Sequence, residues 1–284
     1  MALLSVSTWA LNQHLGPLHW TKWDPQAHRP VTVAEDRPRT LPLTALPARL
    51  AGMGLQACEL GHFHLPALED IKDEHVTEIR SAFHRSEIVL WSLLVDYGDL
   101  SAADPRRRDA DRQYISEWVK MAARLGARHV RVVAGEGSPY DAAAIDRCVS
   151  ALEELADLGR GLGIGILTEN FRRLASTPEV CVQICTRLLD RVHLTADFGN
   201  FPKATRSAAL AHILPFARSV HAKPDLNGEG DIDNAAFDTL LGVAAGAGFD
   251  GAYTVVYEGP ADQWDGVERT AERIRRHPLA LSPR

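Results

Sequence analysis

The chain has few cysteines, and their spacing matches neither a disulfide scaffold nor a zinc ribbon. Its 284 residues include four cysteines and no CxxC pair. Cys181 and Cys185 lie one helical turn apart, beside apolar residues and with no second ligand pair nearby. We therefore expect reduced thiols packed in the core, with a zinc pair as the alternative.

Long apolar runs and an excess of basic residues are also missing. No segment reaches about 18 unbroken apolar residues, the length that predicts a transmembrane helix. The first apolar stretch is short, lacks a preceding Lys or Arg, and favours a strand over a signal peptide. The net charge of −6 argues against sequence-independent nucleic-acid binding and against anionic membranes. We expect a cytoplasmic protein.

Phosphate-binding loops and the common hydrolase motifs are absent too. No predicted strand is followed by GxGxxG or GxxxxGK[ST], and neither GxSxG nor HExxH occurs. The glycines at 159–165 precede a strand, so they end a helix and do not hold a phosphate.

What the chain does contain is a regular alternation of β-rich runs and helical patterns. The near-continuous apolar character of the runs is typical of strands buried on both faces of a parallel sheet. Helical periodicity fills the intervals at about 43–53 and at 68–83, 107–127, 141–163 and 234–248. The predicted strands are 3–8, 55–60, 87–95, 129–134, 164–169, 192–197, 218–223 and 252–258.

Eight such units in one chain of this length predict a single (β/α)₈ TIM barrel over residues 1–284. A doubly wound sheet is the alternative. The long segment 16–40 after the first strand is polar, contains prolines, and carries Trp20 and Trp23. We interpret it as a lid loop over the substrate, because exposed tryptophans are costly; a mobile surface loop is the alternative.

Polar side chains stand at the ends of the predicted strands, where a barrel of this type carries its chemistry. Three consecutive strands supply Glu169, Asp197 and His221. This oxygen, oxygen, nitrogen set suits Mn²⁺, Mg²⁺, Fe²⁺, Co²⁺ or Zn²⁺. Each residue alone has an ordinary structural explanation, such as a helix cap or a core histidine. Their succession on neighbouring strands indicates a divalent-metal site.

The chain resembles the xylose isomerase-like TIM barrels, the sugar phosphate isomerase/epimerase group, over nearly its whole length. The motifs that carry the resemblance are GLQACELGHFHLP (54–66), LGARHVRVVAG (125–135), ILTENF (166–171), LTADFGNF (194–201), SVHAK (219–223) and GFDGAYTVVYEGP (248–260).

The resemblance implies a metal held by Glu, Asp, His and Glu from strands 5 to 8. Glu169, Asp197 and His221 match the first three positions. On the last strand Val256 stands where relatives carry the ligand glutamate, and Glu258 matches a second glutamate two residues later. Glu258 is therefore expected to ligate directly, through water, or not at all. It lies on the same strand face as Val256.

The resemblance further implies proton transfer beside a carbonyl of a sugar, sugar phosphate or polyhydroxy ketone, through an enediolate. Glu169 and Glu258 would be the acid/base pair, and Lys223 would bind an oxyanion, phosphate or carboxylate. A homodimer is compatible with such barrels. The remaining substrate-binding residues that we predict are Trp9, Glu59, His62, His64, Asn170 and Asn200.

Three alternatives stay open or are set aside at this point. A lyase or dehydratase acting on a related keto-sugar or cyclitol would use nearly the same residues. A metal-free, non-catalytic sugar-binding barrel is favoured by Val256. A metal-dependent endonuclease is discounted, because extra ligands and a basic DNA face are missing. For His62 and His64, the alternative to substrate binding is a position in a surface loop.

Overall fold

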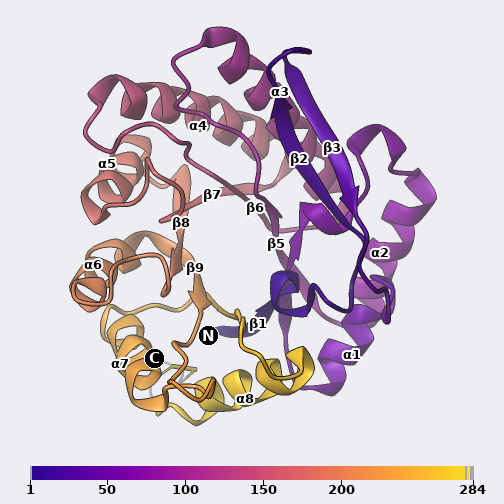
Figure 1. The fold of residues 1–284 in the computed structure, drawn as a ribbon, viewed down its shortest axis with the longest axis vertical. Coiled ribbons are helices and arrows are strands. Elements are labelled where there is room, and N and C mark those ends of the chain that lie inside the picture. Colours follow the sequence, from indigo (N-terminus) through magenta and orange to yellow (C-terminus); the bar gives the residue numbers. More distant parts are fainter. Residues whose placement is uncertain (1, 279, 282–284) are drawn as a thin grey trace.

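The computed structural model describes residues 2–278 and 280–281, and its centre is a closed barrel of eight parallel strands. Around the barrel the strands follow the order β1-β10-β9-β8-β7-β6-β5-β4, so sequential barrel strands are neighbours throughout (Figure 1). The predicted (β/α)₈ barrel is therefore confirmed. The barrel strands are β1 (Leu3–Ser7), β4 (Ala57–Gly61), β5 (Val89–Val95), β6 (His129–Val132), β7 (Gly165–Glu169), β8 (Val192–Asp197), β9 (Ala217–Ala222) and β10 (Ala252–Val255).

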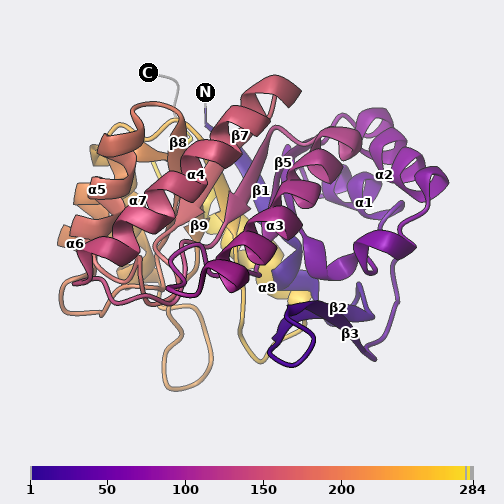
Figure 2. The same ribbon diagram turned by 90° about the horizontal axis from the view of Figure 1, so that it is seen from above.

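Helices cover the outside of the barrel, one after each strand (Figures 1 and 2). Local chemistry sets their ends. Asp104 and Asp141 cap the two longest helices, and Gly126 and Gly163 end them with φ of +80° and +73°. The helices are α1 (Leu46–Gly52), α2 (Asp73–Arg85), α3 (Pro105–Leu125), α4 (Ala142–Leu162), α5 (Pro178–Leu188), α6 (Arg206–Ile213), α7 (Asn234–Gly246) and α8 (Gln263–Arg276).

The long segment at 16–40 after β1, predicted as a lid loop, contains a β-hairpin that the sequence analysis did not predict. Strand β2 (Leu18–Asp24) pairs antiparallel with β3 (Arg29–Glu35). The β-branched and aromatic residues of these two strands favour β-structure. The prolines and charged residues between them made the segment resemble a loop. At the turn, the Asp24 carboxylate accepts hydrogen bonds from the Gln26 and Ala27 N–H groups.

The hairpin is fixed against the barrel by contacts on two sides. Thr21 Oγ1 lies 3.0 Å from the Tyr114 hydroxyl on α3, and the Arg107 guanidinium lies 4.7 Å from the Trp23 ring centroid. Trp20 stacks on Phe63 with ring centroids 5.2 Å apart. The hairpin lies on the side of the molecule away from both chain ends (Figure 2). It therefore forms a wall beside the barrel mouth.

The core is continuous between the barrel and its helices. All four cysteines are free and buried in it, as predicted. The helix expected over 68–83 is divided: Leu68–Asp70 forms a 3₁₀ turn, and α2 begins at Asp73, where Asp73 and Glu74 favour a helix start. Within the described residues, no helix is long and apolar enough to span a membrane.

Candidate active site

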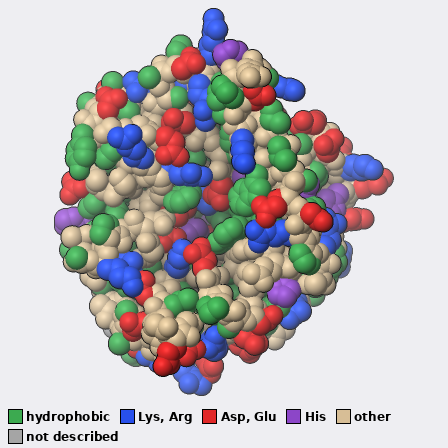
Figure 3. All heavy atoms as spheres, viewed as in Figure 1, with side chains coloured by type: hydrophobic (Ala, Val, Ile, Leu, Met, Phe, Trp, Pro, Cys, Tyr) green, Lys and Arg blue, Asp and Glu red, His purple; other side chains and the backbone are tan. Residues whose placement is uncertain are grey.

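A cavity of about 450 Å³ opens at the barrel mouth, between the strand ends and the hairpin. Viewed from this side, the molecule is hollowed near its middle, with hydrophobic side chains and charges of both signs around the hollow (Figure 3). The cavity brings together most of the predicted site. Its lining includes Trp9, Glu169, Asp197, Asn200, His221, Lys223 and Glu258.

Glu169, Asp197 and His221 form a compact triad at the bottom of this cavity. Glu169 ends β7, Asp197 ends β8, and His221 lies on β9 at the level of Asp197. The His221 Nδ1 atom is 3.3 Å from Asp197 Oδ2 and 3.5 Å from Glu169 Oε1. All three residues are buried, and one ligand atom from each lies within 4.8 Å of the others. Such a group can hold a metal ion.

The far side of the His221 ring is occupied by Glu59. The His221 Nε2 atom is 2.7 Å from Glu59 Oε2, and the Ser219 hydroxyl donates to the other oxygen of that carboxylate. A histidine that ligates a metal usually presents its second nitrogen to such a carboxylate. Glu59 therefore leaves Nδ1 for the cavity, and this arrangement fits a divalent ion bound by Glu169, Asp197 and His221.

The triad and Glu59 also shift each other's protonation. Burial lowers the pKa of His221, but the carboxylates of Glu169 and Glu59 outweigh burial and raise it well above 6.5. Burial raises the pKa of Glu59, but the charge and hydrogen bond of His221 outweigh it, so that pKa lies below its usual value. Without a metal ion, His221 is therefore an imidazolium between carboxylates. A metal ion held at Nδ1 would have to displace the proton of that nitrogen.

Asn170, Gly199 and Asn200 hold the two carboxylates in place. Asn170 exchanges two hydrogen bonds with the backbone of Asp197, accepting from its N–H at 2.7 Å and donating to its carbonyl at 3.1 Å. The Gly199 N–H donates to Asp197 Oδ1, and a Cβ at Gly199 would come within 2.9 Å of the Lys223 side chain. Asn200 donates to Glu169 Oε1 at 3.1 Å. The glycine thus permits the close approach of backbone, carboxylate and lysine.

Glu258 lies outside the triad. Strand β10 ends at Val255, earlier than predicted, so Val256 and Glu258 belong to the loop that follows. The Glu258 carboxylate lies 2.5 Å from Lys223 Nζ and accepts a hydrogen bond from Trp9 Nε1 at 2.7 Å. Val256 is buried and lines the cavity. Within the described residues, the ligand-like group is limited to Glu169, Asp197 and His221.

Comparison with known proteins places the chain in a family. The model of the xylose isomerase-like TIM barrels matches residues 47–277. The chain belongs to the xylose isomerase-like TIM barrel family. No curated protein matches the chain.

Several solved structures share the fold of this xylose isomerase-like barrel. A D-psicose 3-epimerase from Clostridium cellulolyticum H10, solved with D-tagatose, is 14% identical with a TM-score of 0.67, over 99% of this chain and all 100% of that one. A family protein from Mycobacterium smegmatis, in complex with magnesium, is 16% identical with a TM-score of 0.65, over 99% and 98%. A 3-keto-D-glucoside 4-epimerase from E. coli is 17% identical with a TM-score of 0.61, over 82% and 92%. These identities show a shared fold alone.

Four residues predicted to bind substrate in this xylose isomerase-like barrel do not line the cavity. Asn170 and Glu59 have the supporting positions described above, and Glu59 is 0% exposed. His62 and His64 are buried in a 3₁₀ turn after β4, so the surface alternative does not hold either. Burial lowers the pKa of each to about 4. Both are therefore neutral core histidines.

Arg131, on β6 of the family barrel, is a cavity residue that was not predicted from the sequence. Its side chain is 4% exposed, lines the cavity, and forms ion pairs with Asp96 and Glu169. The Nε atom lies 2.9 Å from Glu169 Oε2. The sequence did contain one indication of its position, a charged residue in the middle of the otherwise apolar run HVRVVA. A charged residue is rarely buried without a partner, so an arginine in such a strand indicates a charged group nearby.

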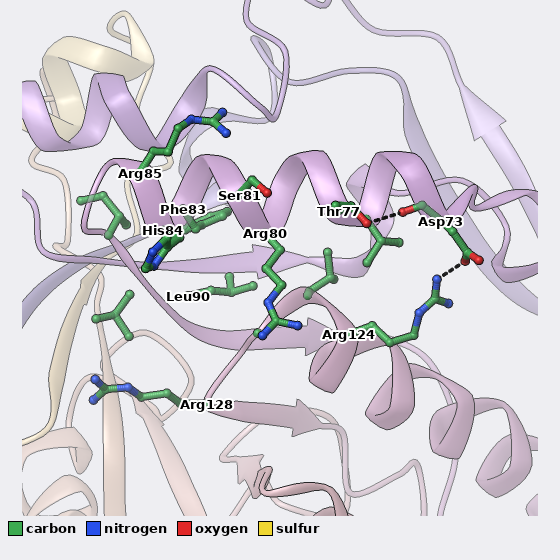
Figure 4. Close-up of a pocket in the computed structure, with 15 residues that line it drawn as sticks. Asp73, Thr77, Arg80, Ser81, Phe83, His84, Arg85, Leu90, Arg124 and Arg128 are labelled. Atoms are coloured by element: carbon green, nitrogen blue, oxygen red, sulfur yellow. Dashed lines mark hydrogen bonds and ion pairs between the residues drawn. The ribbon is translucent and has the colours of Figure 1, made fainter.

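A second cavity of about 1050 Å³ lies elsewhere on the family barrel, outside the strands, between α2 and the C-terminal end of α3. In Figure 4, Arg80 and Arg124 point along this groove, Arg85 points away from it, and Asp73 pairs with Arg124. The apolar floor includes Phe83 and Leu90. The groove lacks converging carboxylates, whereas the group of residues that could hold a metal ion lies at the barrel mouth.

Proposed function

We propose that this chain is a metal-dependent isomerase or epimerase that moves a proton at a carbon next to the carbonyl of a sugar or related polyhydroxy ketone. The observation that carries the proposal is the buried Glu169–Asp197–His221 triad, with Glu59 holding the far nitrogen of the histidine. Solved structures of the same fold include sugar epimerases and a magnesium complex, which supports the proposal.

Glu169, Asp197 and His221 Nδ1 would hold Mn²⁺, Mg²⁺, Co²⁺ or Zn²⁺. When bound, such an ion polarises the carbonyl and neutralises charge on the enediolate oxygens. Glu169 reaches the cavity as one acid/base group, with its oxygens fixed by Asn200 and Arg131. The Asn200 amide does not ionise near neutral pH and cannot act as a general acid or base, so its role would be in binding.

Glu258 is the proposed second acid/base group, from the loop after β10. The hydrogen bond from Trp9 and the ion pair with Lys223 orient its carboxylate. A proton taken up by Glu258 would weaken its attraction to Lys223, and the freed ammonium could then bind a substrate oxyanion, phosphate or carboxylate. The pair therefore couples proton uptake to anion binding.

The hairpin supplies the proposed cover for the substrate. Trp20, Thr21 and Lys22 line the cavity from β2. Trp9, Trp20 and Phe63 pack edge-on or stacked within 6.1 Å of one another. Aromatic faces of this kind pack against the apolar faces of sugar rings. Because the hairpin is anchored on α3, we propose a fixed wall in place of a loop that opens.

A sugar-binding barrel without turnover is the second candidate. Val256 at the cavity wall and the engagement of Glu258 by Lys223 favour it. It predicts ligand binding without proton exchange. A lyase or dehydratase predicts exchange together with loss of a β-substituent.

The test combines metal content with solvent exchange. Protein purified without chelator or histidine tag is analysed by mass spectrometry for bound metals, as wild type, Asp197→Asn and Asp96→Asn. Asp96 lines the same cavity but lies outside the triad, so it is the matched control. We expect about one divalent ion per chain in wild type and the control, and a loss in Asp197→Asn.

The same proteins and Glu169→Gln are then incubated with ketoses in D₂O, and deuterium at the carbon next to the carbonyl is followed by NMR. Exchange in wild type that Glu169→Gln abolishes supports the isomerase or epimerase. Absence of both metal and exchange, after Mn²⁺, Mg²⁺, Co²⁺ and Zn²⁺ have been supplied, would sink the proposal. Binding of a ketose without deuterium exchange would support the second candidate, a sugar-binding barrel without turnover.

A further inference from the structure

Arg131 is a buried cation with one side left open toward the cavity. Its Nε lies beside Glu169, and its Nη1 donates to Asp96 and contacts the Val95 carbonyl. No described residue accepts a hydrogen bond from Nη2. The residue is 3% exposed, and that small exposed part borders the cavity.

Such a group is arranged to meet an acceptor that the protein itself does not supply. Among the described residues, the Arg131 atom that is fully buried without a hydrogen bond is Nε, whereas Nη2 keeps some exposed surface. Charged N–H groups with so little contact with water usually form hydrogen bonds in native structures. The guanidinium is planar and permanently charged, and anchoring at two nitrogens fixes the direction of the third. Its neighbour Glu169 is the acid/base group of the proposed function. The acceptor therefore belongs to whatever lies next to Glu169 in the cavity.

We propose that Arg131 binds the substrate directly, with Nη2 donating a hydrogen bond to the oxygen beside the carbon that exchanges its proton. This inference rests on the proposed function and specifies its ligand: a ketone with an adjacent hydroxyl, bound as a planar pair of neighbouring oxygens. The charge on that oxygen grows as the enediolate forms. A donor already fixed in place stabilises it without reorganisation.

The competing explanation is that Arg131 only holds Glu169 and Asp96. The two explanations differ in what happens to a ligand that needs no proton transfer. Oxalate is a planar dianion with two neighbouring oxygens, so it resembles an enediolate and cannot react by this route. Direct contact predicts weaker oxalate binding when Arg131 is changed. A holding role alone predicts lower kcat with unchanged oxalate binding.

The experiment measures the oxalate Kd by calorimetry, with and without one equivalent of Mn²⁺, after the Mn²⁺ affinity of each protein has been measured separately. The variants are Arg131→Met, which removes the donors, and Arg131→Lys, which keeps a charge for Asp96 and Glu169 if the first variant does not fold. Arg206→Met is the matched control. Arg206 is also a buried arginine, paired with Asp225, and it does not line the cavity.

We expect Arg131→Met to weaken oxalate binding roughly 10-fold to 100-fold and Arg131→Lys to weaken it about 10-fold, the usual range for a charged hydrogen bond. Arg206→Met should bind oxalate as wild type does. Oxalate affinity within about threefold of wild type in both Arg131 variants would overturn the inference. So would a wild type that does not bind oxalate at millimolar concentration. A protein that binds neither Mn²⁺ nor any ketose contradicts the proposed function, and the comparison of oxalate binding still decides the role of Arg131.

Discussion

Replacing Glu59 with glutamine tests the histidine geometry on which the candidate site depends. Glu59 and His221 are 0% and 4% exposed, so solvent screens their 2.7 Å contact very little. Removing one member of a buried charged pair usually destabilises a protein by about 3–5 kcal/mol. We expect the lower end, about 3 kcal/mol, because the glutamine amide can still bond to Ser219 and the His221 ring. At roughly 2–4 °C per kcal/mol, the melting temperature should fall by about 6–12 °C.

The pH dependence gives this prediction a sign. His221 has a pKa raised above 6.5, so its stabilisation is complete below about 6.5 and is lost as the pH rises through the raised value. Glu59 has a pKa lowered below 4.5, so its contribution is present above 4.5 and is lost as the pH falls. The stability difference between wild-type and Glu59→Gln apoprotein should be largest between about pH 4.5 and 6.5 and should shrink on the alkaline side.

The assay is urea denaturation of metal-free protein across that range, followed by Mn²⁺ titration. Glu153→Gln is the matched control, because Glu153 pairs with Arg191 on the exposed surface, where such pairs contribute below about 1 kcal/mol. Mn²⁺ affinity should fall about 10-fold to 100-fold in Glu59→Gln alone. Stability within 1 kcal/mol of wild type together with unchanged Mn²⁺ affinity would refute the assigned support of His221 by Glu59.

Two further predictions concern the walls of the site. Burial lowers the pKa of both His62 and His64 to about 4, so each takes up a proton on unfolding below pH 6.5. The free energy of unfolding should therefore fall from pH 6.5 to 4 by about 3 kcal/mol for each histidine. Urea denaturation of His64→Asn should show an uptake of one proton fewer on unfolding, and an unchanged slope of the unfolding free energy against pH contradicts this. Trp20→Ala removes the stack on Phe63 and the hydrogen bond to Glu35. We expect the free energy of unfolding to fall by roughly 2–4 kcal/mol and ketose binding to weaken. Both are measured against Val33→Ala, a change at an exposed residue. Ketose affinity equal in Trp20→Ala and Val33→Ala would exclude the hairpin as a sugar-binding wall.

The fold and the triad were predictable because both follow from local regularities. Buried parallel strands appear as apolar runs, and the residue that ends each run stands at the barrel mouth. Glu169, Asp197 and His221 could therefore be found from three neighbouring strands. The hairpin at β2 and β3 was harder, since it has no place in the barrel repeat and its stability comes from packing against α3 and Phe63.

The supporting residues could not be assigned from local pattern. Glu59, His62 and His64 occur within a few residues of a strand end, as true lining residues do, yet they are sealed off by their neighbours in three dimensions. Arg131 is the opposite case: it lies within a strand, where no site residue was predicted, yet its side chain lines the cavity. The position of the Glu258 carboxylate depends on where β10 ends and on its ion pair with Lys223. Residue spacing along the sequence predicts neither of these.

The contact between Glu59 and His221 also dictates when the site can exist during synthesis. The two residues are 162 positions apart, and their strands are separated in the barrel by β1 and β10. A growing chain that has completed β8 already carries Glu169 and Asp197, but it has no histidine for either carboxylate or for Glu59. The triad is therefore complete only after β9 has been made, and the contact of His221 with Glu59 also needs β10 and β1 to close the barrel. A chain truncated before β9 would carry Glu169 and Asp197 without the histidine.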